Sequence, residues 1–388
     1  MAGQRPLRVL QVIGSMDIGG AENVVMSLVN GLDPSRYQVG VCCTRFLGAL
    51  GERLLADRKT VLVAAPRRRW TRHVTPLLLA RAVSRFGADV VHTHGTPALL
   101  HAGPLALAGW FPPWVHTFHH GNYPLASAKQ MLGERLFSPA ATQLVAVADR
   151  QREALAQCLR MSPGRILTVV NGVADNPFLH DEVLRCRVRA GLGFHPSDVV
   201  VGCVAVLRPQ KGLAFLIEAA GMLVDRHPRL RVLSAGGGPE EGALRARVEA
   251  LGLESRVVIT GWHQDNQRML CALDVFAMPS LWEAMPLALL EAMAARRPAV
   301  VTDVAENARI VDQGACALLV PPCDAPALAS AIARLVEQPE LGRGLASRAY
   351  QRYLERFGTA TMVAAYERLY EESSGYAPTA TAHASVRV

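Results

Sequence analysis

One repeat of the pattern that fills this chain is residues 199–235, VVVGCVAVLRPQKGLAFLIEAAGMLVDRHPRLRVLSA. The apolar run 199–206 has the length of a buried strand, 213–226 has the apolar spacing of a helix, and 231–235 is again strand-like. A strand, a helix and a strand joined by short loops form one unit of a parallel sheet with its crossover helix. The stretch therefore predicts an α/β fold.

The same alternation continues on both sides of this stretch. In the first half the strand-like runs are 8–13, 38–44, 61–64, 90–94, 114–118, 144–147 and 166–170, and in the second half 199–206, 231–235, 257–259, 275–278, 299–301 and 317–320. A turn at Asn171-Gly172 and a polar stretch through residue 197 separate the two series. We therefore expect two doubly wound domains, 1–180 and 181–355, then a C-terminal helix, 356–373, that returns to the first domain, and a flexible tail, 374–388.

Composition bounds the class of protein. The chain has 388 residues, of which 50% are hydrophobic and 19% charged, which excludes a largely disordered protein. Its eight cysteines are scattered and none forms a C-x-x-C pair, so we expect reduced thiols and a cytoplasmic protein. The apolar run near the N-terminus is too short for a signal peptide, and the most apolar window, 97–115, contains four prolines, so we expect no transmembrane segment.

Charge is concentrated in the first half of the chain. Residues 1–188 hold 21 Lys and Arg against 12 Asp and Glu, whereas residues 189–388 hold 20 against 21. The window from Arg53 to Arg85 contains nine basic residues and one acid: Arg53, Arg58, Lys59, Arg67, Arg68, Arg69, Arg72, Arg81 and Arg85, with Asp57. This window is either a solvated basic face or a surface for anionic lipid or another polyanion, and Trp70 favours a membrane interface.

Ligands of open α/β sheets bind beyond the carboxyl ends of the strands, so the loops that follow those ends are the candidate binding sites. The first strand ends in GSMDIGGAE, where Gly19 and Gly20 precede a helix and allow close backbone approach to a ligand. The strand 199–206 leads into LRPQKG, which places Arg208 and Lys211 at a helix start. Two cations there suit a diphosphate, although two ordinary surface charges would give the same pattern.

The loop and helix LWEAMPLALLEAMAARRP, residues 281–298, contain a pair of glutamates, Glu283 and Glu291. Pro286 fits the first helical position, so Glu283 precedes the helix and Glu291 lies in its second turn, on the apolar face. A carboxylate on that face needs hydrogen-bond partners. Sugar hydroxyls would supply them, and a salt bridge to Arg296 is the alternative.

Two other motifs point to less specific chemistry. Gly236, Gly238 and Gly242 only loosely resemble a dinucleotide fingerprint, so we expect no nicotinamide site there. Five histidines gather in DVVHTHG and WVHTFHHG: His92, His94, His116, His119 and His120. No carboxylate or thiolate with ligand spacing accompanies them, so hydrogen-bonding histidines are favoured over a metal site, and we expect no metal.

Together these residues resemble the retaining glycosyltransferases of family 4, which have the GT-B fold. The resemblance runs from GGAE at residues 19–22 through VNGV at 170–173 and RPQKG at 208–212 to Glu283 and Glu291, which look like the E-x7-E motif of the family. It implies two Rossmann-like domains facing a central cleft. It also implies transfer of a sugar from a nucleotide diphosphate sugar, such as a UDP-sugar, without metal or other cofactor.

The resemblance also implies roles for individual residues. Arg208 and Lys211 would hold the diphosphate and stabilise the leaving group, Glu283 would contact the donor sugar, and Glu291 would bind the ribose. Backbone amides around Met285 to Leu287, a stretch that includes Pro286, would support the sugar or the phosphate. His119 would face the transferred sugar, and Gly19 and Gly20 would line the cleft. The candidate catalytic residues are thus Glu283, His119, Arg208 and Lys211.

The chain departs from the usual family pattern at three places. Ala284 and Arg296 stand where the family often has glycine, and VAENARIV, residues 304–311, has Ala305, Glu306 and Arg309 where a glycine pair and a glutamate are frequent.

The sequence does not identify the acceptor substrate. The basic first domain suggests a lipid-linked or polysaccharide acceptor, and peripheral attachment to the inner face of a membrane. Two other classes remain: a GT-B-like sugar-nucleotide epimerase and a non-catalytic protein that binds a polyanion or a membrane. The basic window lacks the interleaved aromatic residues of a nucleic-acid platform, so we expect no nucleic-acid partner.

Overall fold

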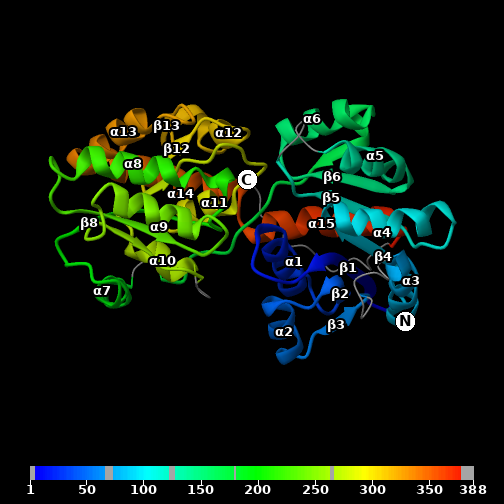
Figure 1. Cartoon of the computed structure of the whole chain (residues 1–388). Helices are drawn as coiled ribbons and strands as arrows, with labels where there is room; N and C mark the ends of the chain where they lie inside the picture. The colour runs from blue at the N-terminus through cyan, green and yellow to red at the C-terminus, as the bar shows by residue number, and fades with distance from the viewer. Residues whose placement is uncertain (1–4, 66–72, 122–126, 179–180, 263–265, 377–388) are drawn as a thin grey trace. The chain divides into compact units, whose positions relative to one another are not determined.

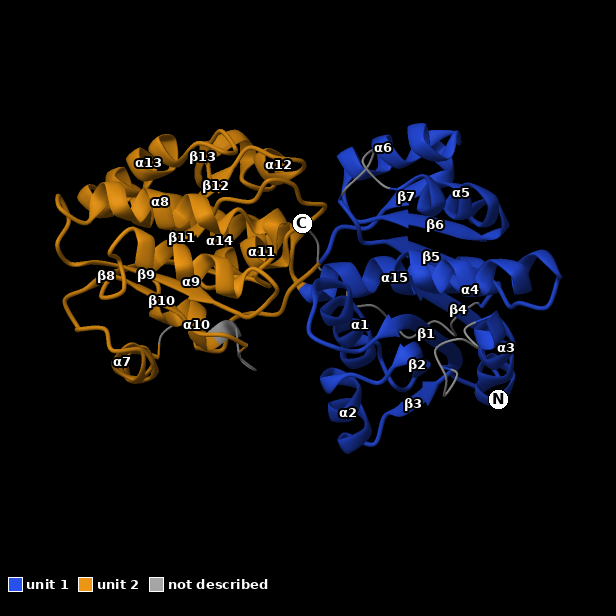
Figure 2. Ribbon diagram, in the orientation of Figure 1, with its two compact units in different colours: residues 1–171, 359–388 blue, residues 172–358 orange. Residues whose placement is uncertain are grey.

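The computed structural model of the protein describes residues 5–65, 73–121, 127–178, 181–262 and 266–376. The chain forms two compact units (Figures 1 and 2). The first unit contains residues 1–171 and 359–388, and the second contains residues 172–358.

The first unit is built on a parallel sheet with strand order β3-β2-β1-β4-β5-β6-β7 among the described residues. The strands are β1 (Leu7–Ser15), β2 (Tyr37–Phe46), β3 (Thr60–Val63), β4 (Val90–His94), β5 (Trp114–Phe118), β6 (Gln143–Ala146) and β7 (Ile166–Thr168). The helices are α1 (Gly20–Gly31), α2 (Ala49–Ala56), α3 (Thr75–Phe86), α4 (Gly95–Leu107), α5 (Ala128–Phe137), α6 (Asp149–Leu159) and α15 (Thr359–Ser374), with short 3-10 turns η2 (Ser138–Ala140) and η3 (Pro163–Arg165).

The second unit repeats the plan with strand order β10-β9-β8-β11-β12-β13, again parallel in its described part. Its strands are β8 (Val199–Val204), β9 (Leu230–Ala235), β10 (Val257–Ile259), β11 (Val275–Met278), β12 (Ala299–Thr302) and β13 (Leu318–Val320). Its helices are α7 (Glu182–Gly191), α8 (Leu213–Leu223), α9 (Glu241–Ala250), α10 (Asn266–Ala272), α11 (Leu287–Ala294), α12 (Asn307–Ile310), α13 (Ala325–Glu337) and α14 (Pro339–Arg356), with 3-10 turns η4 (Pro209–Lys211) and η5 (Asp312–Gly314).

Alternation of side chains along the strands divides the core of the first unit into two faces. One face buries Leu10, Val12 and Val91 against helices that include α3 and α4. The opposite face buries Val9 and Val90 against α1 and α15. The C-terminal helix α15 therefore covers a face of a sheet whose strands are more than 190 residues earlier in the sequence (Figure 1).

The first unit ends at residue 171, earlier than the 180 expected from sequence, and the last helix begins at Thr359 rather than at 356. Pairing in the second unit explains both differences. The Val173 amide donates to the Phe357 carbonyl over 2.9 Å, and the buried Tyr353 hydroxyl donates to the Val173 carbonyl over 3.1 Å. Val173 and Phe357 thus both belong to the second unit.

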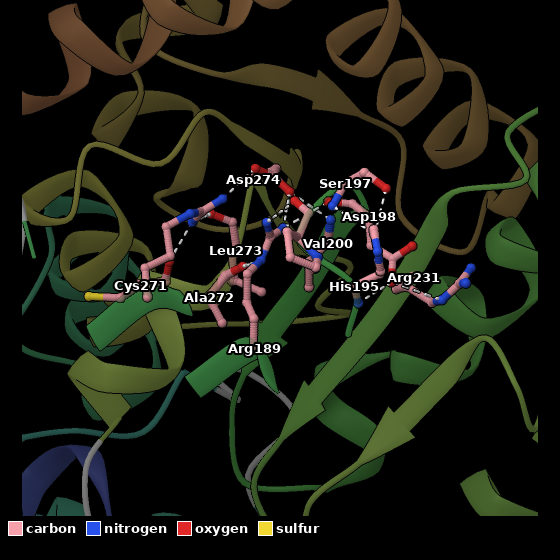
Figure 3. Close-up of polar contacts among 12 residues, drawn as sticks. Arg189, His195, Ser197, Asp198, Val200, Arg231, Cys271, Ala272, Leu273 and Asp274 are labelled. Atoms are coloured by element: carbon pink, nitrogen blue, oxygen red, sulfur yellow. Dashed lines mark hydrogen bonds and ion pairs between the residues drawn. The ribbon is translucent and has the colours of Figure 1, made fainter. Parts of the chain in front are cut away.

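Two largely buried arginines, Arg185 and Arg189, attach α7 to the sheet of the second unit, and Figure 3 shows Arg189 beside Asp274. Arg185 and Arg189 place guanidinium nitrogens 2.6 and 2.5 Å from the two carboxylate oxygens of Asp274. The Val200 amide donates to the same carboxylate over 2.7 Å, so Asp274 joins α7 to the start of β8. Arg189 also donates to the carbonyls of Ala272 and Asp198.

In the part of the chain that the structure describes, no helix is both long enough and apolar enough to cross a membrane. All eight cysteines are unpaired.

Candidate functional site

The two central strands of the second sheet, β8 and β11, lie side by side, with the strand order running in opposite directions from them. The loops after their carboxyl ends therefore meet at the switch point of the sheet, where open α/β folds bind ligands. The β8 loop contains Arg208 and Lys211, and the β11 loop contains Glu283. The backbone joins the two loops, since the Leu281 amide donates to the Gln210 carbonyl over 2.8 Å.

Gly212 allows this close approach. Its φ is +59°, and a Cβ at this position would lie 2.1 Å from the Pro279 carbonyl oxygen. Only glycine fits without movement of the β11 loop.

Lys211 and Glu283 contact each other. The Lys211 ammonium lies 2.6 Å from Glu283 Oε1, and their side chains are 18% and 5% exposed. Ser280 donates its hydroxyl hydrogen to the same oxygen over 2.8 Å, and the Gln210 amide nitrogen donates to Oε2 over 3.3 Å. Glu283 is thus fixed by three donors. The sequence did not predict this pairing, because it links loops that are 72 residues apart.

Arg208 has a different environment. Its side chain is exposed and has no polar partner among the described residues. An unpaired guanidinium beside the paired Lys211 gives this loop one cation available for phosphate oxygens and one held by a carboxylate.

Glu291 is half-buried in the second turn of α11 and has no ion-pair or hydrogen-bond partner among the described residues. Burial raises the pKa of its carboxyl to about 7. Arg296, the alternative partner considered from the sequence, stacks instead on Tyr350, with 4.1 Å from the guanidinium carbon to the ring centroid. The Glu291 carboxyl can therefore accept hydrogen bonds from hydroxyl groups.

Residues 285–287 connect these two glutamates. Met285 is buried, and Pro286 is the N-cap of α11, so the helix begins at Leu287, one residue later than the start at Pro286 expected from the sequence.

The glycine run after β9 has a structural role. Positive φ occurs at Gly236 and Gly238, where a Cβ would lie 1.9 and 2.4 Å from the carbonyl oxygens of Ala205 and Leu207. These glycines let the β8 and β9 loops pack backbone to backbone.

The candidate residues of the first domain lie in the first unit. Gly19 precedes α1 and has an extended backbone, and Gly20 is the first residue of that helix. His119 follows β5 and is half-buried, and its Nε2 lies 3.0 Å from Nδ1 of the buried His94. Burial lowers the pKa of His119 to about 3, so its imidazole is neutral.

The other histidines also have hydrogen-bond partners. His92 contacts Tyr370 and Thr117, and the His116 Nδ1 lies 2.7 Å from the Thr93 hydroxyl. Within the described ranges no group of three or more His, Cys, Asp or Glu side chains is arranged to hold a metal ion.

A separate hollow of about 770 Å³ lies in the second unit. Its lining is Asp175, Asn176, Pro177, Asp181, Glu182, Val183 and Tyr350. It shares no lining residue with the β8 and β11 loops, and we base the site on those loops because they place cations and carboxylates at the switch point.

The chain matches the models of two known families. Residues 18–176 match the model of Glycosyltransferase Family 4, and residues 198–338 match that of Glycosyl transferases group 1. The D-inositol 3-phosphate glycosyltransferase of Saccharomonospora viridis is 31% identical over 306 residues, 74% of this chain and 70% of that protein. This chain belongs to the family 4 glycosyltransferases.

Other relatives place this family 4 glycosyltransferase among enzymes with diverse substrates. The UDP-Gal:alpha-D-GlcNAc-diphosphoundecaprenol alpha-1,3-galactosyltransferase of Escherichia coli is 26% identical over 65% of this chain and 67% of that protein. This chain spans only part of the length of two further curated relatives, 64% of one and 30% of the other.

Solved structures give the fold. The crystal structure of HepE from Anabaena in complex with UDP-glucose superposes with a TM-score of 0.85 at 21% identity, over 94% of this chain and all of that one. The two Rossmann-like units therefore have the GT-B fold, as predicted from sequence.

Proposed function

We propose that this family 4 glycosyltransferase transfers a sugar from a UDP-sugar to a lipid-linked or polysaccharide acceptor, with retention of configuration. The observation that carries the proposal is the arrangement at the β8–β11 switch point. The two adjacent loops contain an unpaired Arg208 and a Lys211–Glu283 pair, and the helix that follows the β11 loop, α11, contains the partnerless carboxyl of Glu291. Cations bind diphosphate oxygens, and carboxylates accept hydrogen bonds from sugar hydroxyls. The two together suit a nucleoside diphosphate joined to a sugar.

Each residue has a distinct task in this proposal. Arg208 binds the diphosphate, and Lys211 moves part of its interaction from Glu283 to the phosphate oxygens as charge develops on the leaving group. Glu283 then accepts hydrogen bonds from the donor sugar. Glu291 accepts hydroxyl hydrogens of the ribose, which its position on α11 and its lack of a protein partner favour.

The cations of the chain itself would neutralise the leaving diphosphate, so we propose that transfer needs no metal ion. Comparing turnover in EDTA with turnover in added Mg²⁺ or Mn²⁺ tests this part. Equal rates are expected, and loss of activity in EDTA that Mn²⁺ restores would contradict it.

The test of function is a turnover assay with a panel of UDP-, GDP- and ADP-sugars and polyprenyl-diphosphate-linked or polysaccharide acceptors. We expect release of UDP that depends on the acceptor, with an α-linked product from an α-linked donor. Interconversion of the donor alone, without acceptor, would support the epimerase instead.

A membrane-bound acceptor would need a docking surface, and the first unit has suitable chemistry. Large apolar side chains are exposed on or just after three neighbouring helices, α3, α4 and α5: Leu77, Leu107, Trp110, Leu132 and Leu136 are 57–76% exposed. The same unit exposes Arg53, Arg58, Lys59, Arg81 and Arg85 of the basic window. Arg67, Arg68, Arg69, Trp70 and Arg72 lie outside the described residues. We propose peripheral attachment to the cytoplasmic face of an anionic membrane through this unit.

Co-sedimentation with vesicles of anionic and of zwitterionic lipid tests the attachment. We expect binding to anionic vesicles only, and weaker binding after Arg67, Arg68 and Arg69 are changed to Gln. Arg226→Gln with Arg247→Gln in the second unit is the matched control. Unchanged binding of the triple variant would contradict attachment through the basic window.

A further inference from the structure

A continuous row of buried polar side chains crosses the first unit beneath α15. On one face of the sheet the strands begin with apolar residues such as Val9 and Val90 and become polar toward their carboxyl ends. Gln11 of β1 pairs in register with His92 of β4, and His94 pairs with Thr117 of β5. These side chains are at most 2% exposed, so every polar atom in the row must find its partner within the protein.

One half of the row begins at His119. The His119 Nε2 lies 3.0 Å from His94 Nδ1, and the His94 Nε2 lies 2.8 Å from the carbonyl oxygen of the Gln11 side chain. The Gln11 amide nitrogen donates to the Tyr370 hydroxyl over 3.1 Å.

The other half joins α15 back to the sheet. The Tyr370 hydroxyl lies 2.7 Å from His92 Nδ1, the His92 Nε2 lies 2.8 Å from the Thr117 hydroxyl, and that hydroxyl lies 3.0 Å from the Tyr366 hydroxyl. Seven side chains thus form one uninterrupted row of hydrogen bonds.

Gln11 sets the direction of the bonds toward His119. Its carbonyl oxygen can only accept, so His94 must carry its hydrogen on Nε2. A neutral His94 then has a lone pair on Nδ1, and the facing nitrogen of His119 must be the donor. A neutral His119 with hydrogen on Nε2 has its lone pair on Nδ1.

Both imidazoles are neutral. Burial and the neighbouring imidazoles lower the pKa of His94 well below its usual value, and burial lowers that of His119 to about 3. Among the described residues the His119 Nδ1 has no hydrogen-bond partner. It does not belong to the polar side-chain atoms that are both fully buried and without a partner.

We infer that Gln11 and His94 are positioning residues that hold His119 in the tautomer with hydrogen on Nε2, so that its Nδ1 presents a hydrogen-bond acceptor to a sugar hydroxyl. The sugar as ligand rests on the proposed function, whereas the tautomer does not. The site accordingly takes a hydroxyl donor at this nitrogen and disfavours a group that can only accept.

The tautomer can be measured directly in the 388-residue chain labelled with ¹⁵N-histidine. Two-bond ¹H–¹⁵N correlation spectra distinguish a protonated from an unprotonated ring nitrogen, and the His119→Gln variant assigns the His119 signals. We expect hydrogen on Nε2 in the wild type at pH 7.5. Hydrogen on Nδ1 would overturn the inference, and this result does not depend on a measurement of activity.

Variants distinguish a row that positions His119 from a row that only holds α15 against the sheet. Gln11→Met removes the acceptor, so we expect a new population of His119 with hydrogen on Nδ1, and Gln11→Glu should restore the wild-type tautomer. Tyr366→Phe is the matched control, because it removes an equally buried hydroxyl of α15 at the far end of the row. A purely structural row would lower stability in both variants and leave the His119 tautomer unchanged, which would overturn the inference.

The ligand part has a separate readout. Adding UDP-glucose should shift the His119 Nδ1 resonance, whereas UDP alone should not. If UDP-glucose raises the melting temperature but leaves Nδ1 unmoved, the acceptor role fails while donor binding stands. If no nucleotide binds at all, the proposed function fails, and the tautomer result still decides the role of Gln11 and His94.

Discussion

At the scale of single residues, Arg208 and Lys211 belong to one loop but differ in what their loss should do. Arg208 is exposed and unpaired in the described structure, so Arg208→Ala should weaken UDP binding about 10- to 100-fold and leave the unfolding midpoint unchanged. Lys211→Met should also weaken binding, and in addition lower the free energy of unfolding by about 3 kcal/mol, because it leaves the buried Glu283 without its cation. Isothermal titration and urea unfolding measure the two effects, and equal stability of both variants would contradict the paired role of Lys211.

The ionised carboxyl of Glu291 should lower the free energy of unfolding by an amount that depends on pH. Its folded pKa of about 7 lies above the usual value for a glutamate, so the folded state disfavours the ionised carboxyl. The cost is absent below about pH 4.5, grows as pH rises, and is complete above pH 7. Glu291→Gln should therefore unfold at higher urea than the wild type at pH 8, by on the order of 2 kcal/mol, and nearly equally at pH 4.5.

The matched control for this prediction is Glu249→Gln on the exposed face of α9, which should change stability at neither pH. A Glu291→Gln variant that is less stable than wild type at pH 8 would show that the carboxyl has a stabilising partner.

At two of the positions where the chain departs from the family pattern, the backbone has a conformation that favours glycine. Ala305 and Arg296 replace usual glycines, and both have positive φ, +47° and +49°. This conformation costs a residue with a Cβ about 1–2 kcal/mol. Ala305→Gly should thus raise the free energy of unfolding by about 1 kcal/mol, after the entropy of the unfolded glycine is subtracted.

Ala308→Gly in the adjacent helix α12 is the control, since a glycine at a helical position should lower stability by about 1 kcal/mol. If both variants lose stability, the positive φ at Ala305 is not a source of strain.

At the scale of elements, α7 depends on one carboxylate. Asp274→Ala leaves the guanidinium groups of Arg185 and Arg189 without their anion, and both are largely buried. We expect the second unit to lose about 3 kcal/mol of unfolding free energy, with faster hydrogen exchange in α7. The control Glu340→Ala removes an exposed ion pair to Arg343 and should change neither measurement. If hydrogen exchange becomes faster only in α7 and the free energy of unfolding stays unchanged, Asp274 holds α7 in place without stabilising the unit as a whole.

The elements themselves were predictable because strands of a parallel sheet are buried on both faces and read as short apolar runs. Each predicted run overlaps a strand of the structure, from Leu7–Ser15 to Leu318–Val320. The ends were less certain: β8 ends at Val204, two residues before the apolar run does, because the chain turns toward the Arg208 loop. The domain boundary also required the pairing of Val173 with Phe357, which no local pattern contains.

The candidate site was only partly predictable. Spacing identified Glu283 and Glu291, but not that Lys211 pairs with one of them, since that contact depends on how two loops pack. It also missed Gln11, Tyr366 and Tyr370. A glutamine in an otherwise apolar strand was the available signal, because a buried amide needs partners, but those partners come from the far end of the chain.

At the scale of the whole molecule, acid should act on the two units in opposite directions. Burial keeps the pKa of His92 and His94 well below the usual value and lowers those of His116 and His119 to about 3. Below about pH 6.5 the unfolded chain binds protons that the folded first unit cannot, so this unit should lose about 1.4 kcal/mol per pH unit for each such histidine. The second unit should gain stability as Glu291 is protonated.

Two buried thiols report on the units separately: Cys42 in the first and Cys203 in the second. Urea titrations at pH 5.5 and 7.5, each read by a brief thiol-labelling pulse at a common pH, should show the Cys42 midpoint falling with acid while the Cys203 midpoint does not. Parallel movement of both midpoints would contradict this assignment of the titrating groups.

The central claim is that the loops after β8 and β11 hold the diphosphate and ribose of a sugar nucleotide. Calorimetric titration of UDP into the wild type, Glu291→Ala and the control Glu249→Ala tests it most directly. We predict saturable binding to the wild type and to Glu249→Ala, and at least about tenfold weaker binding to Glu291→Ala, the loss of roughly one hydrogen bond to a charged group. Equal affinity of all three proteins, or no binding of UDP, GDP or ADP to any, would contradict the site.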